Sequence, residues 1–239
     1  LAAAHADDKP VAASSLSFSI IPRLNAAGRM GDAQVALDLL LEDDFDAASA
    51  KAEQLEEIND QRRAIEAELA EIARLQEEGI YTGQRVLVVS GEGWHEGVTG
   101  IVASRVVRWY GVPVLLFTID EHGEARGSGR SVGEVNLFKA VEGCADLLPR
   151  FGGHEAAVGI TLPADKLPEF TERLSAFMDE LPEGCFHPRI DIDAVVELGE
   201  LTLENVEKLE VLAPFGQENR QPCYLAQGVM MTKSRAVGA

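Results

Sequence analysis

Residues 80–182 alternate between apolar runs typical of buried strands and amphipathic runs typical of helices. Val86–Ser90 is a nearly continuous apolar run, Val98–Tyr110 has the spacing of a helix, and Val112–Ile119 is a second apolar run. A strand–helix–strand order predicts a right-handed crossover between two parallel strands. The pattern therefore predicts an α/β domain.

The rest of this region continues the alternation. In chain order we expect a strand at Ala125–Ser131, a helix from about Asn136 to Leu148, a turn at Phe151–His154, a strand at Ala157–Leu162 and a helix from about Asp165 to Leu181. Residues 80–182 are therefore expected to form a mixed α/β domain.

The segment before this domain is expected to be a helical connector, residues 34–79. Ala33–Leu41 reads as a short helix, and Asp44 or Asp46 can cap a longer one that ends at Gly79 as its C′ residue. The long helix has a narrow apolar stripe with Arg62 at one position of the seam; the stripe is Leu55, Ile58, Ile65, Leu69 and Ile72. Such a helix braces domains or, as the alternative, forms a coiled-coil dimer.

The two ends of the chain have weaker patterns. Residues 1–33 show little periodicity and are expected to be the tail end of a preceding domain. Residues 183–239 begin with a Pro- and Gly-containing linker, and are too few for an independent core. Within them we expect a strand at Ile190–Val195, a helix at Leu203–Val211 and a strand near Cys223–Met231. This segment is expected to be part of a separate β-rich module.

Composition limits the possible classes of protein. No stretch approaches the ~20 apolar residues that cross a membrane, and Leu1–Asp8 has neither a Met nor a basic segment typical of a signal peptide. A start of this kind suggests a domain excised from a longer protein or a proteolytic product. The cysteines, Cys144, Cys185 and Cys223, are sparse and scattered, which favours a reducing compartment and predicts a cytoplasmic protein.

The formal net charge of −19 is opposite to that of a typical protein that grips a nucleic-acid backbone. Two interpretations stay open. The acidic residues can form a solvated surface that serves solubility alone. Alternatively, a few clustered arginines can form a local positive groove inside an acidic shell.

Two motifs combine small residues with groups that suit a phosphate or a base. Pro22–Met30 places Arg23 and Arg29 on either side of small residues, which we interpret as a tight turn; it is either a phosphate contact or a surface turn with a capping Asn. Gly91–Gly100 is a glycine-rich turn before a helix, where backbone N–H groups can hold an anion and where Trp94 and His95 can stack on a base. The alternative is a tight turn with Trp94 partly buried.

Two further motifs carry candidate ligand-binding residues. Arg126–Ser131 alternates glycine with polar residues, so Ser128 and Arg130 project on the same side of an extended segment and can cradle a phosphate, beside Ser131. In Phe151–Gly159, Gly152 and Gly153 allow close approach before His154, which is either a site residue or a structural histidine. No Gly-x-Ser-x-Gly elbow or triad acid accompanies these residues, which disfavours a serine hydrolase.

Together these segments resemble RecJ-type single-strand exonucleases of the DHH phosphoesterase superfamily. The resemblance is carried by PRLNAAGRM, GWHEGVTGIVASR, GSGRS, RFGGHEAAVGI and LAPFGQEN, in that order, and covers nearly the whole chain. The GGH motif alone is a weak signal, since the DHH-associated domain also occurs in nano-RNases, cyclic-dinucleotide phosphodiesterases and alanyl-tRNA synthetases. The first and last segments favour RecJ, in which LAPFGQEN leads into an OB-like domain.

The resemblance implies degradation of single-stranded DNA from its 5′ end, in DNA repair and recombination, by two Mn²⁺ or Mg²⁺ ions held in an N-terminal DHH domain. It implies that residues 80–182 are the DHH-associated domain and hold the strand and its 5′ phosphate. By that analogy Arg29, Ser128 and Arg130 bind phosphate. The other residues expected along the strand are Trp94, His95, Gly152, Gly153 and His154.

The sequence departs from the family pattern, since it has no Asp-His-His motif and the nearby His5, Asp7 and Asp8 do not match one. Residues 183–239 also stop before an OB-like barrel could close. We therefore expect a chain that binds no metal and does not cut DNA alone. The alternatives are a related phosphodiesterase acting on short oligonucleotides or cyclic dinucleotides, and a non-catalytic module that binds partners through its acidic helix 46–78.

Overall fold

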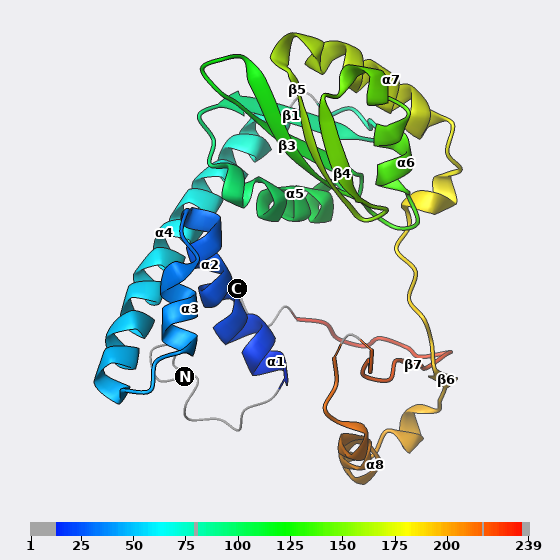
Figure 1. Cartoon of the computed structure of the whole chain (residues 1–239). Coiled ribbons are helices and arrows are strands. Elements are labelled where there is room, and N and C mark those ends of the chain that lie inside the picture. The colour runs from blue at the N-terminus through cyan, green and yellow to red at the C-terminus, as the bar shows by residue number, and fades with distance from the viewer. Residues whose placement is uncertain (1–12, 79–80, 217, 236–239) are drawn as a thin grey trace. The chain divides into compact units, whose positions relative to one another are not determined.

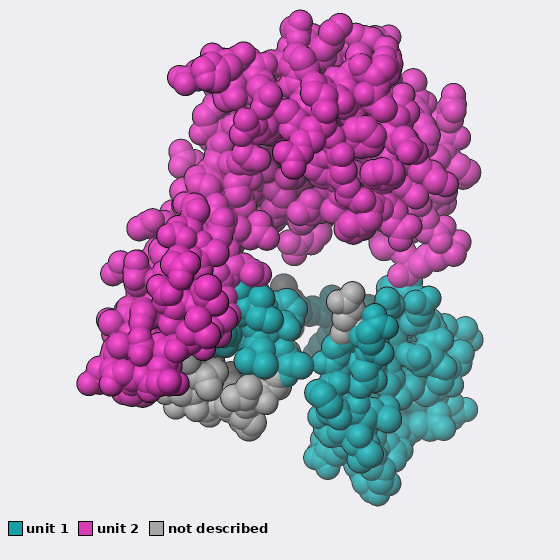
Figure 2. All heavy atoms as spheres, viewed as in Figure 1, with its two compact units in different colours: residues 1–21, 190–239 teal, residues 22–189 magenta. Residues whose placement is uncertain are grey.

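A computed structural model describes residues 13–78, 81–216 and 218–235. The chain divides into two compact units, shown in different colours in Figure 2. The larger unit is residues 22–189, and the smaller one combines residues up to 21 with those from 190 onward. The candidate site lies in the larger unit.

The larger unit is built on a mixed five-stranded sheet with the order β1-β2-β3-β5-β4. Its strands are β1 (Leu87–Glu92), β2 (Val114–Ile119), β3 (Glu124–Arg130), β4 (Arg150–His154) and β5 (Ala157–Pro163). The pairing of β1 with β2 is parallel, across the crossover helix α5 (Glu96–Tyr110), and the other pairings are antiparallel. The structure therefore confirms the expected α/β fold and its parallel pair.

Helices cover the two faces of the sheet differently (Figure 1). On one face, α6 (Leu137–Glu142) and α7 (Leu167–Asp179) bury a core that includes Phe117 and Phe170, whose rings meet edge to face at 5.9 Å. On the other face, α5 lies over β2 and β3 and packs against α4 (Phe45–Glu77). We call the first the closed face and the second the open face, because α5 leaves part of it uncovered.

The long helix α4 begins where the sequence predicts. The Asp44 side chain accepts a hydrogen bond from the Ala47 N–H at 2.9 Å, which makes Asp44 the N-cap. The helix is described to Glu77; Gly79, the expected C′ residue, lies outside the described residues. Leu69 of the predicted stripe is buried in the core beneath α5, so the helix braces the sheet domain as expected.

A buried ion-pair network replaces apolar contacts in the middle of this helix–helix interface. The Glu66 carboxylate, whose side chain is 4% exposed, pairs at 2.6 Å with Arg62 of α4 and at 2.6 Å with Arg105 of α5. Burial lowers the pKa of Arg62. The arginine that interrupts the apolar stripe therefore lies where α4 meets α5.

The segment before α4 is helical, which corrects one expectation. Its elements are α1 (Ala13–Ser15), a π-helix (Leu16–Ile20), α2 (Ile21–Met30) and α3 (Gln34–Leu40). Pro22–Met30 is thus a helix and not a tight turn. Pro22 lies within continuous helical backbone, directly after the π-helix and Ile21. Ala27 packs against Ala36 and Leu55 in a small core. Tertiary packing outweighs the low helix propensity of Gly28.

A second correction concerns Phe151–His154, which forms most of β4 and not a turn. The other expected elements differ mainly at their ends. The expected helix 136–148 is α6 followed by a 3₁₀ turn at Ala145–Leu147, and α7 follows a 3₁₀ turn at Ala164–Lys166. A 3₁₀ turn at Glu183–Phe186 follows α7.

The smaller unit has shorter strands than the sequence predicts. Here β6 (Ala194–Val195) pairs in parallel with β7 (Tyr224–Leu225), and the pairing is extended by backbone hydrogen bonds from Asp193 and Val196. Its helices are α8 (Leu203–Lys208) and 3₁₀ turns at Leu198–Glu200 and Leu209–Leu212. None of the described helices is both long and apolar enough to cross a membrane.

Candidate nucleic-acid interface

The alternation of side chains along β3 separates its glycines from its polar residues. A Cβ atom added at Gly127 would lie 2.4 Å from the Phe117 ring, and one at Gly129 would lie 2.6 Å from Val158. Both glycines therefore point into the closed face. Because neighbouring residues of a strand point to opposite faces, Ser128 and Arg130 lie together on the open face, as predicted.

The strand register extends this open face over β5 and β4. Three rows of paired residues run across the three strands; they are Arg130–Ala157–His154, Ser128–Gly159–Gly152 and Arg126–Thr161–Arg150. We call the first the proximal row, the second the glycine row and the third the distal row. The register thus brings the predicted GSGRS and GGH motifs together on one surface.

A groove with a volume of about 750 Å³ lies over the glycine and distal rows. Gly152 and Gly159 form part of its lining, and a Cβ atom added at either would meet no atom within 4 Å. The Glu96 side chain at the start of α5 and Pro149 before β4 also line it. The two glycines therefore leave space above the sheet that side chains would otherwise fill.

The proximal row carries a guanidinium without an acidic partner among the described residues. Arg130 donates to its neighbouring carbonyl at Gly129 (2.7 Å) and lies against Gly100 of α5, where an added Cβ would be 2.5 Å from its Nη2 atom. Burial, and then the nearby charge of Arg29, lower the pKa of Arg130. Two cations are thus held near each other, an arrangement that an anion would stabilise.

Arg29 reaches this site from α2. Its Nη1 atom donates to the Gly97 carbonyl at 3.0 Å. The backbone at Arg29 also touches α5, since a Cβ added at Gly97 would lie 2.0 Å from the Arg29 carbonyl oxygen. Gly97 therefore permits the close contact that brings Arg29 beside the open face.

Arg23, predicted with Arg29, lies elsewhere. It donates two hydrogen bonds to the Glu56 carboxylate of α4, one of them at 2.9 Å from its Nη2 atom. The pair is about three-quarters buried or more, with side chains 19% and 27% exposed. The structure therefore gives Arg23 a partner that joins α2 to α4.

The predicted stacking residues occupy the turn between β1 and α5. Trp94 is half-buried, and its indole covers Gly91, where an added Cβ would lie 2.3 Å from the ring. The His95 side chain is the N-cap of α5, because its Nδ1 atom accepts from the Gly97 N–H at 3.2 Å. Both side chains thus have local structural contacts.

The remaining predicted residues divide between the surface and the loops. His154 is exposed at the end of the proximal row, where its Nδ1 atom accepts from the Ala156 N–H at 3.3 Å. The Ser131 hydroxyl donates to the Val135 carbonyl at 2.6 Å. Gly153 has φ 145°, and a Cβ there would lie 2.2 Å from the Ala157 carbonyl oxygen, so β4 needs a glycine at this position beside β5.

Two arginines of the distal row were not among the predicted site residues. Arg126 has the same strand parity as Ser128 and Arg130, so the alternation of the GSGRS segment could have identified it. Arg150 precedes the paired glycines of β4, and only the register with β5 places it opposite Thr161. Both residues line the groove.

The residues that the structure describes do not form a metal site of their own. Within that part of the chain no three His, Cys, Asp or Glu side chains gather closely enough to hold a metal ion. His5, Asp7 and Asp8 lie outside the described residues. The open face carries guanidinium and hydroxyl groups, which are suited to binding an anion.

Comparisons with known proteins agree with this architecture. Residues 83–180 match the DHHA1 domain family, and residues 192–239 match the RecJ OB domain family. The single-stranded-DNA-specific exonuclease RecJ of Bacillus subtilis is 35% identical over 229 residues, and RecJ of Escherichia coli is 33% identical over 233 residues. Each alignment covers 94% of this chain but only 29% and 40% of the respective relative, so the chain spans about a third of their length.

Solved structures show the same relationship. RecJ from Thermus thermophilus in complex with Mn²⁺ superposes with a TM-score of 0.80 at 31% identity, over 94% of this chain and 33% of that one. The same protein in complex with Mg²⁺ gives a TM-score of 0.78 at 31% identity, over 92% of this chain and 34% of that one. The chain therefore belongs to the RecJ family, of which it carries the DHHA1 domain and residues matching the RecJ OB domain.

Proposed function

We propose that this chain is the substrate-binding part of a RecJ-like 5′-to-3′ single-stranded-DNA exonuclease that acts in DNA repair and recombination in the cytoplasm. In this proposal the open face of the sheet holds the strand, and the proximal row holds its 5′ phosphate. The family membership and the names of the relatives support this role. So does the geometry of the open face.

The observation that carries the proposal is the pairing state of Arg29 and Arg130. In a chain with a net charge of −19, neither guanidinium has a carboxylate partner among the described residues, although most other arginines do. Ser128 adds a hydroxyl donor on the same face. A local cationic site within an acidic protein is the second of the two interpretations that the composition left open.

We further propose that the metal ions of catalysis belong to an N-terminal DHH domain of the whole protein. The Thermus thermophilus relative was solved with Mg²⁺ and with Mn²⁺. Two divalent ions can stabilise the attacking and leaving oxygens of a phosphodiester. This chain supplies the groups that orient the strand, and we expect it not to cut DNA by itself.

Replacing Arg130 tests the proposal. We expect the chain to bind a labelled, 5′-phosphorylated single-stranded oligonucleotide, with an affinity that falls as salt rises. Arg130→Ala should weaken binding roughly ten- to a hundredfold, because a hydrogen bond to a charged group contributes about 1.5–3 kcal/mol. Fluorescence anisotropy across a salt series measures both quantities.

Arg173→Ala is the matched control, since Arg173 is an arginine of the closed face that pairs with Asp146 and Glu169. It should leave binding unchanged. Equal losses in both variants, or no binding of the oligonucleotide by the wild-type chain at low salt, would contradict the proposed role. Tighter binding of a dinucleotide than of a dodecanucleotide would favour a phosphodiesterase for short substrates instead.

A further inference from the structure

The groove on the open face extends away from the proximal row, toward the distal row. Arg126 and Arg150 stand on β3 and β4 with Thr161 of β5 between them. Adjacent strands lie about 4.8 Å apart, so the two arginine Cα atoms are separated by two strand spacings, about 10 Å. Their long side chains can therefore approach one group bound above Thr161.

The two arginines differ in their charge balance. The Arg150 side chain is exposed and makes no hydrogen bond or ion pair with any residue that the structure describes. Arg126 donates to Glu124 at 2.8 Å and lies 3.7 Å from Glu96, and these contacts raise its pKa. Arg150 is therefore the free cation of the distal row, whereas Arg126 shares its charge with two carboxylates.

On β5 and β4, the floor between the proximal and distal rows has no side chains. Gly159 and Gly152 form it, and each is open above its Cα atom. Their amide groups lie in the β4–β5 ladder. This floor allows a polymer to pass close to the sheet, but it offers few specific polar contacts.

The distance between the rows determines which part of a strand meets the distal arginines. Arg130 lies four residue steps along β3 from Arg126, which corresponds to about 13 Å at 3.3 Å per residue. A strand whose bases stay stacked advances about 3.4 Å per nucleotide, so this distance spans roughly four nucleotides, and fewer if the strand is stretched. A terminal phosphate at Arg130 cannot also be the group at Arg150.

We infer that Arg150, assisted by Arg126, binds an internal backbone phosphate of the same single strand whose 5′ phosphate lies at Arg130. The inference rests on the proposed function and adds a second contact to it. It predicts that affinity increases with strand length, because only oligonucleotides long enough to pass over Gly152 and Gly159 reach the distal row.

The test compares Arg150→Ala with Arg130→Ala on 5′-phosphorylated oligonucleotides from a dinucleotide to a dodecanucleotide. Each competes with a labelled dodecanucleotide bound to the 239-residue chain. Arg150→Ala should weaken binding of the dodecanucleotide roughly tenfold and lower the slope of log affinity against log salt by about one. It should leave binding of the dinucleotide unchanged. Arg130→Ala should weaken both.

A second variant should act in the opposite direction. Glu124→Gln removes one carboxylate partner of Arg126. It should tighten binding of the dodecanucleotide several-fold without affecting binding of the dinucleotide. Arg173→Ala again serves as the control for loss of a positive charge.

The possible outcomes separate this inference from the proposed function. Equal weakening of short and long strands by Arg150→Ala, or weakening of neither, overturns the distal contact even when Arg130→Ala behaves as proposed. Loss of all wild-type binding overturns both. A length-dependent loss confined to Arg150→Ala supports the distal contact.

Discussion

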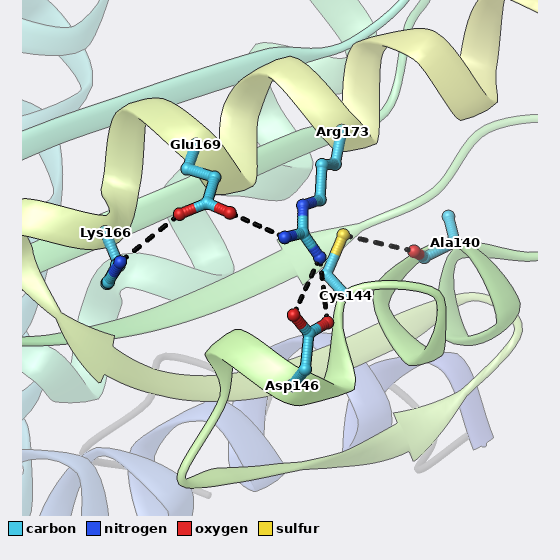
Figure 3. Close-up of polar contacts among 6 residues, drawn as sticks. All are labelled: Ala140, Cys144, Asp146, Lys166, Glu169 and Arg173. Carbon is cyan, nitrogen blue, oxygen red and sulfur yellow. Dashed lines mark hydrogen bonds and ion pairs between the residues drawn. The ribbon is translucent and has the colours of Figure 1, made fainter.

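Arginines on the two sides of the same sheet differ in whether they pair with carboxylates. On the closed face, Arg173 of α7 pairs with Asp146 at 2.8 Å and with Glu169, which also binds Lys166 at 3.3 Å (Figure 3). On the open face, Arg130 and Arg150 have no acidic partner among the described residues. Ion pairs on the closed face join elements of the fold, whereas two arginines of the open face, Arg130 and Arg150, are not neutralised by a described carboxylate.

Glycines show the same difference. Gly127 and Gly129 face the closed side, where the space for a Cβ atom is already filled by Phe117 and Val158. Gly152 and Gly159 face the open side, where nothing lies within 4 Å of an added Cβ. The first pair permits close packing, and the second pair leaves a groove. Glycine thus allows tight packing on the closed face and leaves room for a ligand on the open face.

The largest effect should come from the closed face. Phe170 is fully buried against Phe117, so Phe170→Ala should reduce the free energy of unfolding by about 3–5 kcal/mol, as measured by urea denaturation. Oligonucleotide affinity of the folded fraction should not change. A loss of affinity without a loss of stability would show that the two faces are not separable.

A matched pair of glycine variants sharpens the comparison. Gly127→Ala should destabilise the chain by about 1–3 kcal/mol, because its new methyl group would overlap the Phe117 ring. Gly159→Ala should change stability by less than about 0.5 kcal/mol but weaken binding of long oligonucleotides. Thermal unfolding measures the change in stability, and fluorescence anisotropy measures the change in binding. A loss of stability in Gly159→Ala and a loss of binding in Gly127→Ala would mean that the open and closed faces are wrongly assigned.

The smallest effect concerns the ion pairs in Figure 3. Hydrogen bonds from Arg173, and then from Lys166, lower the pKa of Glu169 below its ordinary value of 4.5. A carboxyl with a lowered folded-state pKa stabilises the fold above its unfolded pKa, and this stabilisation is lost as pH falls. Glu169→Gln should therefore lower Tm slightly at neutral pH and not at pH well below 4.5. A Tm difference that persists in acid or in high salt would point to packing instead.

The sequence predicts those parts of the fold that depend on local pattern. The apolar runs of β1 and β2 and the Asp44 cap are visible in the residue order, and the structure confirms them. The turns expected at Pro22–Met30 and Phe151–His154 were wrong, because the proline and glycines there favour turns locally. Contacts with other elements, with α4 for the first and β5 for the second, determine the observed helix and strand.

The candidate site shows the same limit. Alternation alone predicts that Ser128 and Arg130 share a face. It cannot predict that Gly152 and Arg150 lie on that face as well, because this depends on the register of β4 against β5. Nor can it distinguish Arg23, which has a carboxylate partner, from Arg29, which has none among the described residues. The DNA-binding roles of all these residues, and domain boundaries after residues 33, 79 and 182, stay predictions.

The position of β4 at the edge of the sheet has a consequence for self-association. An exposed strand edge is a template on which another chain can add a strand and begin to aggregate. β4 is a poor template, because it is short, begins with the charged Arg150 after Pro149, and contains two glycines, one of them with φ 145°. Arg150 and Gly152, which line the groove, therefore also make the β4 edge less able to pair with a strand of a second copy of the chain.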